Sequence, residues 1–318
     1  MSDDDLHELR QSDLDRTLDW IRAGAAGREQ GVFGSTSAIW QVDREAAVFL
    51  RAGRALLMQL AHPWVATAIA EHSTALADPF RRFHRTFEIV FALVFGSLDQ
   101  ALATARRLHR RHAVIRGQLP ESFARYVAGS PYYANEVSAL MWVHATLVDT
   151  AVRAYELVLP ELLPDFREHY YADCRRLGAL FGIPVEAQPG NWQEFARYVE
   201  TTIASDQLEV GAAARSIAAG VLAGAGRIPV PRWYRDLTTT LLPQQLRLGY
   251  GLPFGRAEEQ RAKRAVRFLR HVYPSIPSRL QSVPPYFEAL GRLSGRSRPD
   301  LMTRSLNRLW IGRASLPS

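Results

Sequence analysis

Apolar residues recur at intervals of three and four along most of the chain, and this periodicity limits the possible fold more than any other feature. It predicts helices at 12–26, 44–60, 79–95, 98–116, 137–158, 161–181, 191–203, 206–222, 232–246 and 256–273. Alternating runs bounded by turn pairs, which are typical of strands, are scarce. Asp78-Pro79 combines a capping side chain with proline at the first helical position, a strong signal for a helix start. We therefore predict an all-α protein.

The 318 residues contain no long linker, which favours one large multi-helix domain over two separate ones. A chain of this length can bury a core deep enough to hold a cofactor. Within it we expect an N-terminal helical extension at 1–32 and a main domain at 33–250. A C-terminal helical extension would cover 251–318, with a polar and mobile tail after Arg296.

The formal net charge of +7 does not indicate a nucleic-acid-binding protein. Lys263 is the only lysine, and the arginines are spread along the chain among Asp and Glu instead of forming a basic patch with aromatic residues. Cys174 is the only cysteine, which excludes a disulfide framework and a thiolate metal cluster. The acidic start lacks the features of a signal peptide, and no apolar run approaches the length of a transmembrane segment. We expect a cytoplasmic protein.

Most of the nine histidines lie between residues 62 and 144, and one of them interrupts an apolar stripe. The stripe consists of Ala101, Ala105, Leu108, His112 and Ile115. A histidine in this position needs a hydrogen-bond partner or a metal, because burying it alone is unfavourable. A neutral imidazole is also well suited to bind haem iron axially. From the pattern alone, a core histidine bonded to a backbone carbonyl is the more common case.

The helix that begins at Pro79 carries Arg82 and Thr86 on one line with Ile89 and Leu93. A guanidinium and a hydroxyl at the mouth of an apolar face could bind an iron-bound oxygen species or a haem propionate. The alternative is a solvated first turn in which Thr86 bonds back to its own helix. The spacing does not separate these two interpretations.

Other candidate sites have weaker patterns. His144 shares a line with core residues, so it is either a satisfied core histidine or a haem contact. His109 and His112 are three apart and could bind one ion from the same helix. The carboxylate–histidine pairs Glu71-His72 and Glu168-His169 are adjacent in sequence and are expected to point to different faces, so no inward Glu-x-x-His site is predicted. No motif of an activated nucleophile is present.

Several short segments occur in an order that resembles the DUF2236 family, which contains the rubber oxygenases and the MpaB oxygenase. They are Gln59-Leu60-Ala61-His62-Pro63, His72-Ser73, Asp78-Pro79-Phe80-Arg81-Arg82-Phe83-His84-Arg85-Thr86, His112-Ala113-Val114-Ile115-Arg116-Gly117 and Trp142-Val143-His144-Ala145. The resemblance covers roughly residues 33–250. It implies an all-α catalytic domain that binds haem b.

The resemblance also implies roles for individual residues. His112 matches the family's proximal iron ligand, and Arg82 and Thr86 match its Arg-x-x-x-Thr element at the haem. Arg85 stands where rubber oxygenases have a lysine that can cap the iron; arginine is a poorer ligand because it stays protonated. His144 and His109 remain candidates for cofactor contacts.

The function implied by the resemblance is oxidation of a hydrophobic small molecule, isoprenoid or aromatic, with dioxygen or peroxide. The alternative is a protein that stores, senses or transfers haem without turnover. A further alternative is a helical interaction protein without a cofactor.

Overall fold

The computed structural model describes residues 8–73, 79–224 and 229–317, and it confirms the all-α prediction. The first half contains α1 (Gln11–Ala23), α2 (Ala38–Asp43), the 3-10 helix η2 (Ala46–Arg51), α3 (Ala52–Leu60), α4 (Pro63–His72), α5 (Pro79–Phe95), α6 (Leu98–Ala113), β1 (Arg116–Gln118), β2 (Pro131–Tyr133) and α7 (Val137–Val158). The second half contains α8 (Pro164–Leu180), η3 (Val185–Ala187), α9 (Trp192–Ala204), α10 (Ala212–Ala223), α11 (Arg232–Leu241), α12 (Gln244–Gly249), α13 (Arg256–Val272), η4 (Tyr273–Ser275), α14 (Ser278–Gln281), α15 (Pro284–Leu293) and α16 (Leu301–Ile311).

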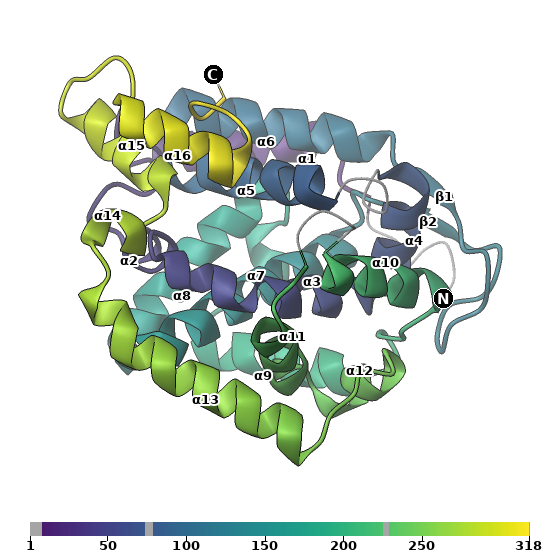
Figure 1. Ribbon diagram of the computed structural model, residues 1–318. Helices are drawn as coiled ribbons and strands as arrows, with labels where there is room; N and C mark the ends of the chain where they lie inside the picture. The colour runs from purple at the N-terminus through teal and green to yellow at the C-terminus, as the bar shows by residue number, and fades with distance from the viewer. Residues whose placement is uncertain (1–7, 74–78, 225–228, 318) are drawn as a thin grey trace.

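Helix α7 runs through the middle of the molecule, with other helices around it (Figure 1). It begins at Val137, where the carboxylate of Glu136 accepts a hydrogen bond from the Ala139 amide at 2.8 Å. Most of its length is buried, and it packs against η2, α3, α8, α9 and α13. A helix that is apolar on nearly all sides is stable only inside such a core.

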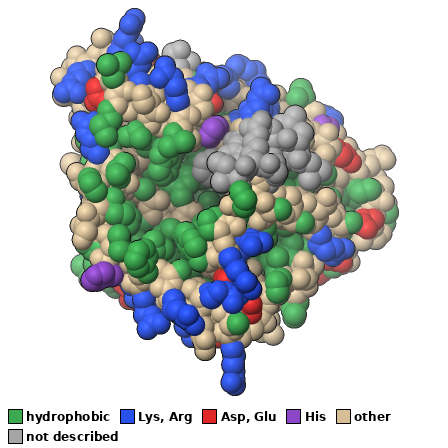
Figure 2. Space-filling model, in the orientation of Figure 1, with side chains coloured by type: hydrophobic (Ala, Val, Ile, Leu, Met, Phe, Trp, Pro, Cys, Tyr) green, Lys and Arg blue, Asp and Glu red, His purple; other side chains and the backbone are tan. Residues whose placement is uncertain are grey.

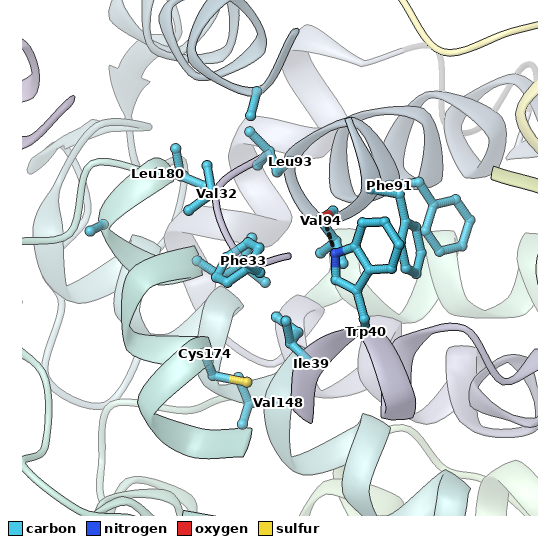
Figure 3. Close-up of a cluster of buried hydrophobic side chains, with 14 of the residues drawn as sticks. Val32, Phe33, Ile39, Trp40, Phe91, Leu93, Val94, Val148, Cys174 and Leu180 are labelled. Carbon is cyan, nitrogen blue, oxygen red and sulfur yellow. Dashed lines mark hydrogen bonds between the residues drawn. The ribbon is translucent and has the colours of Figure 1, made fainter. Parts of the chain in front are cut away.

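The N-terminal helices are fixed to α5 through Trp40 on α2. Its indole nitrogen donates to the Val94 carbonyl oxygen at 2.9 Å, and its ring meets Phe95 edge-on at a centroid distance of 5.2 Å. Figure 3 shows this hydrogen bond within the surrounding cluster, which also includes Cys174 of α8. Because the indole is buried and its donor is satisfied, this contact fixes α5 against α2.

Helix α6 begins at a capping box, in which the Ser97 hydroxyl and the Gln100 side chain each accept from the other's backbone amide. It ends at Ala113, earlier than the predicted 116, because residues 116–118 form β1 and pair antiparallel with β2. Gly117 lies opposite Tyr132 in this pair, and a β-carbon at Gly117 would come within 2.8 Å of the tyrosine hydroxyl. Close packing against Tyr132 therefore requires glycine there.

The structure differs from the sequence prediction at several helix boundaries. The predicted 44–60 helix is the 3-10 helix η2 followed by α3, and the predicted 232–246 helix is divided into α11 and α12 at Pro243. Helices α2, α4, α14, α15 and α16 were not predicted. Helix α16 occupies the segment expected to be a mobile tail, and it packs against α5 and α15 with Asn307 and Ile311 buried. The predicted cap Asp78 lies outside the described residues.

Candidate active site

A cavity of about 250 Å³ is formed mainly by α4, α5, α6 and α7. We call it the histidine cavity. It brings together five of the six residues singled out in the sequence: Arg82, Arg85, Thr86, His112 and His144. These residues come from three helices, and Arg82 and His144 lie more than fifty positions apart in the chain, so only the fold places them at one site.

His112 lies in the last turn of α6 and is half-buried, facing the histidine cavity beside Leu108 and Ile115. Its Nδ1 atom is buried and has no hydrogen-bond partner among the described residues. Burial lowers the pKa of His112 to about 4, and the charge of Arg111 acts in the same direction. The imidazole is therefore neutral at physiological pH, which is the form that binds a metal ion.

His144 faces the same cavity from α7 and is almost completely buried. Burial lowers its pKa to about 4. The Cys174 backbone acts on this pKa in the opposite direction, but neither ring nitrogen completes a hydrogen bond with a described residue. The expectation of a satisfied core histidine is therefore not met within the described part of the chain.

His109 does not line the histidine cavity, although it is three residues from His112 on the same helix. Its imidazole is buried on the side of α6 where the carboxylates of Asp15 and Glu8 act on it. The pKa of His109 is lowered by burial, and these carboxylates oppose the shift. The two histidines therefore do not face a common ion site.

Four guanidinium groups line the histidine cavity, and no described carboxylate does. They belong to Arg81, Arg82, Arg85 and Arg111. Arg82 donates a long hydrogen bond of 3.4 Å to the Ser73 hydroxyl. Burial lowers the pKa of Arg82 to about 10, and the charge of Arg111 adds to this effect, so Arg82 still carries its charge at neutral pH. The cavity therefore favours an anionic ligand.

The Thr86 hydroxyl donates to the Arg82 carbonyl oxygen at 3.1 Å. This is the bond back to its own helix that was the alternative in the sequence analysis. It does not remove Thr86 from the site, since the residue still lines the cavity and its oxygen retains acceptor capacity.

A second cavity of about 330 Å³ adjoins the first, and its walls are mostly apolar. We call it the apolar cavity. Its walls come from α2, η2, α3, α5, α7, α8, α10 and α11, together with neighbouring loop residues. The two cavities share five lining residues: Gln59, Arg82, Thr86, Val90 and Leu147. Figure 2 shows a hollow surrounded by hydrophobic side chains on the face of the molecule seen in Figure 1.

The sequence analysis did not identify His72 and Tyr132, which line the histidine cavity, or Glu71 beside them. The side chains of Glu71 and His72 were expected to point to different faces, but both approach the Tyr132 hydroxyl, which donates to Glu71 and lies 3.1 Å from His72 Nε2. This is possible because α4 ends at His72 and the chain turns away from helical geometry. No sequence signal placed Tyr132 beside these residues, because the β1–β2 pairing that does so was not predicted.

A scan against protein-family models matches residues 39–271 to the catalytic domain of the ER-bound oxygenase mpaB/B′ and rubber oxygenase. The match covers more than half of the chain. The chain belongs to this family. All residues that line the two cavities of this mpaB/rubber-oxygenase domain lie within the matched range. Comparisons with curated proteins and with solved structures gave no match.

Metal-binding clusters and membrane-spanning helices are both missing from the described residues. These residues contain no cluster of three or more His, Cys, Asp or Glu side chains arranged to hold a metal ion. None of their helices combines the length and the hydropathy needed to cross a bilayer. A haem iron needs only one or two protein ligands, so the first result does not conflict with a single axial histidine.

Proposed function

We propose that this chain is a haem b-dependent oxygenase that acts on a hydrophobic small molecule, with His112 as the residue that would hold the haem iron. The observation that carries the proposal is the shared wall between the two cavities. Arg82 and Thr86 line both the cavity that holds His112 and the apolar cavity beside it. A cofactor in one and a hydrocarbon in the other would meet at these two polar side chains.

The residues present fit a haem on three grounds. His112 and His144 each present a buried ring nitrogen without a partner among the described residues, as an axial ligand or close contact requires. Four arginines without a described carboxylate suit the two propionates of haem b. Trp64, which also lines the cavity, has a buried indole nitrogen that lacks a described acceptor.

A bound haem would supply the activation of dioxygen or peroxide. The apolar cavity would bind the substrate, orient it toward the junction and exclude water from it. Arg82 would hold a positive charge there, and Thr86 would offer a hydroxyl oxygen at the same point. Arg85 would not act as a sixth iron ligand, because its guanidinium stays protonated.

An absorbance spectrum with a pyridine haemochrome assay tests the cofactor part of the proposal. We expect a Soret band and about one haem b per chain after expression with sufficient haem. Folded protein that shows no Soret band after haem addition would refute it.

Oxygen consumption separates an oxygenase from a protein that only stores, senses or transfers haem. The haem-loaded protein would be tested with a panel of isoprenoid and aromatic compounds, with dioxygen and with peroxide. Uptake that depends on one of these compounds supports the oxygenase. Stable haem without turnover of any of them would favour the haem carrier.

A further inference from the structure

The apolar cavity contains one carboxyl group, on Asp43. Asp43 ends α2 and is 9% exposed, and Tyr170 on α8 is 1% exposed. The Tyr170 hydroxyl donates to Asp43 Oδ1 at 3.1 Å. The pair therefore forms a polar group in the wall that α2 and α8 contribute, whereas Arg82 and Thr86 belong to the wall from α5.

Among the described residues, no backbone amide donates a hydrogen bond to the Asp43 carboxyl. The neighbouring carboxyl of Asp173 has a structural role, since it accepts from the Ile39 backbone amide at 3.1 Å and does not line the cavity. Within the described part of the chain, the Asp43 carboxyl accepts a hydrogen bond from Tyr170 alone. Burial raises the pKa of Asp43 to about 7, and the charge of Asp173 acts in the same direction. A buried polar group of this kind is stabilised by a further hydrogen-bond donor.

We infer that the Asp43–Tyr170 pair binds the hydroxyl group of an otherwise hydrophobic alcohol. The inference rests on the proposed function and names the substrate class of that site. Above the pKa of Asp43, the free lone pairs of its carboxylate accept a hydrogen bond, so the ligand must donate one. A carboxylate ligand would be repelled by Asp43 and Asp173. An ammonium group would have to lose its water among mostly apolar walls, which is far less favourable than burying a hydroxyl.

This binding mode would fix the direction of the substrate. The hydroxyl would lie against α2 and α8, and the hydrocarbon would extend along Val48, Phe87 and Leu147. Leu147 and Val90 belong to the wall shared with the histidine cavity, so the carbon chain would face the junction. The hydroxyl is thus a positioning group, and oxidation would occur on the hydrocarbon.

The test compares two ligands of the same chain length, dodecanol and dodecyl methyl ether, which differ in the hydroxyl donor. Their binding to the full-length protein is measured by calorimetry at a pH above the pKa of Asp43. We expect the alcohol to bind about tenfold more tightly, as one hydrogen bond to a charged acceptor predicts. Equal affinities would overturn the inference.

Substitutions test whether Asp43 causes the preference for the alcohol. In Asp43→Leu, the preference for the alcohol should fall to about one while the ether keeps its affinity within about twofold. Asp173→Asn is the matched control, because it changes a neighbouring carboxyl that does not line the cavity, and it should keep the preference. An unchanged preference in Asp43→Leu would contradict the inference. If that variant does not fold, Asp43→Asn should lower the preference about threefold, because a neutral acceptor is weaker, and no change there would be equally decisive.

The outcome can be separated from that of the proposed function. The calorimetric titration detects the alcohol whether or not haem is bound. Loss of the alcohol preference in protein with an intact Soret band would refute only the role of Asp43. Absence of the Soret band would refute the haem proposal and leave the titration result as it stands.

Discussion

The indole nitrogen of Trp142 on α7 donates a hydrogen bond of 2.9 Å to the backbone carbonyl oxygen of Met58 on α3. One turn further along α7, Thr146 accepts a hydrogen bond of 3.0 Å from the Gln59 side chain. These two bonds join the same pair of helices, and Gln59 lines both cavities. The wall between the cavities is therefore held by a polar clamp within an otherwise hydrophobic core.

Replacing Trp142 with phenylalanine tests this clamp. Trp142→Phe removes the donor and leaves the Met58 carbonyl oxygen with only the Ala61 amide at 3.3 Å, so the free energy of unfolding should fall by about 1 kcal/mol. Chemical denaturation followed by circular dichroism measures the change. Trp20→Phe is the control, because Trp20 is 51% exposed, and it should change stability by less than about 0.5 kcal/mol. Equal effects of the two substitutions would show that the clamp contributes little.

The axial ligand is tested by comparing two histidines of α6. His112→Ala should abolish stable haem retention, because His112 faces the histidine cavity with an unpartnered Nδ1. His109→Ala should retain haem, since its side chain lies outside that cavity. Haem content and electron paramagnetic resonance of the iron distinguish the two. If only His109→Ala loses haem, the assignment is wrong; if neither does, His144 becomes the leading candidate.

The role of Thr86 is tested with Thr86→Val, which keeps the shape of the side chain and removes the hydroxyl. We expect normal haem content, an altered spectrum of ligand complexes and turnover lower by about tenfold. Thr201→Val is a matched control, because its hydroxyl also bonds to its own helix, at 2.8 Å from the Arg197 carbonyl oxygen, but lines neither cavity. Arg82→Ala should additionally lower haem affinity. Spectra and turnover unchanged in both Thr86→Val and Arg82→Ala would remove these residues from the site.

The exposed arginines at the cavity should slow haem dissociation through their positive charge. Arg85→Gln and Arg111→Gln should each raise the rate of haem loss about two- to fivefold, a modest change because exposed ion pairs are screened by solvent. Transfer of haem to an excess of apomyoglobin measures this rate. Arg110→Gln is the control, because Arg110 lies beside Arg111 on α6 but does not line the cavity, and it should not change the rate. If all three substitutions raise the rate of haem loss equally, the effect comes from the net charge of the protein and not from the position of the arginines.

Stability should fall in mild acid because of the buried histidines. Burial lowers the pKa of His62 to about 3 and the pKa values of His112 and His144 to about 4. The unfolded chain binds these protons below about pH 6.5 and the folded protein does not, so the free energy of unfolding decreases by a few kcal/mol between pH 6.5 and 4. Asp43 opposes this trend. Because burial raises its pKa, the folded protein binds this proton at a higher pH than the unfolded chain does.

Denaturation at a series of pH values tests this dependence. His144→Phe should make the acid slope shallower, because one buried group no longer titrates. Trp20→Phe replaces an exposed side chain that does not titrate and should leave the slope unchanged. A parallel slope in His144→Phe would mean that His144 takes up its proton equally in both states.

Helices with strong local signals could be predicted from the sequence. Helices α5 and α7 have the predicted bounds, because their apolar periodicity is strong and, for α5, Pro79 marks the start. Helix α4 was not predicted because it carries apolar residues on nearly all of its faces. Its sequence therefore lacks the periodic alternation of apolar and polar residues that indicates a helix. The end of α6 was misplaced because pairing with β2, a contact distant in sequence, decides it.

In the candidate site, too, residues with a local sequence signal could be predicted, and residues brought together only by folding could not. His112 stood out because one imidazole interrupted an apolar line, a feature of a single helix. Asp43 and the apolar cavity left no such trace, since their partners come from eight secondary-structure elements and meet only in the folded chain. Tyr132 could not be predicted for the same reason. It reaches Glu71 only because β2 pairs with β1, where Tyr132 lies opposite Gly117.

The shared wall has a consequence for how such a protein can diversify. Ile217, Val221 and Leu222 line the apolar cavity and not the histidine cavity. Substitutions there would change which molecules fit without touching the residues proposed to hold the cofactor. Selection could then change the substrate range while the cofactor-binding residues are inherited unchanged. Only changes at the five shared residues would affect substrate binding and cofactor binding at once.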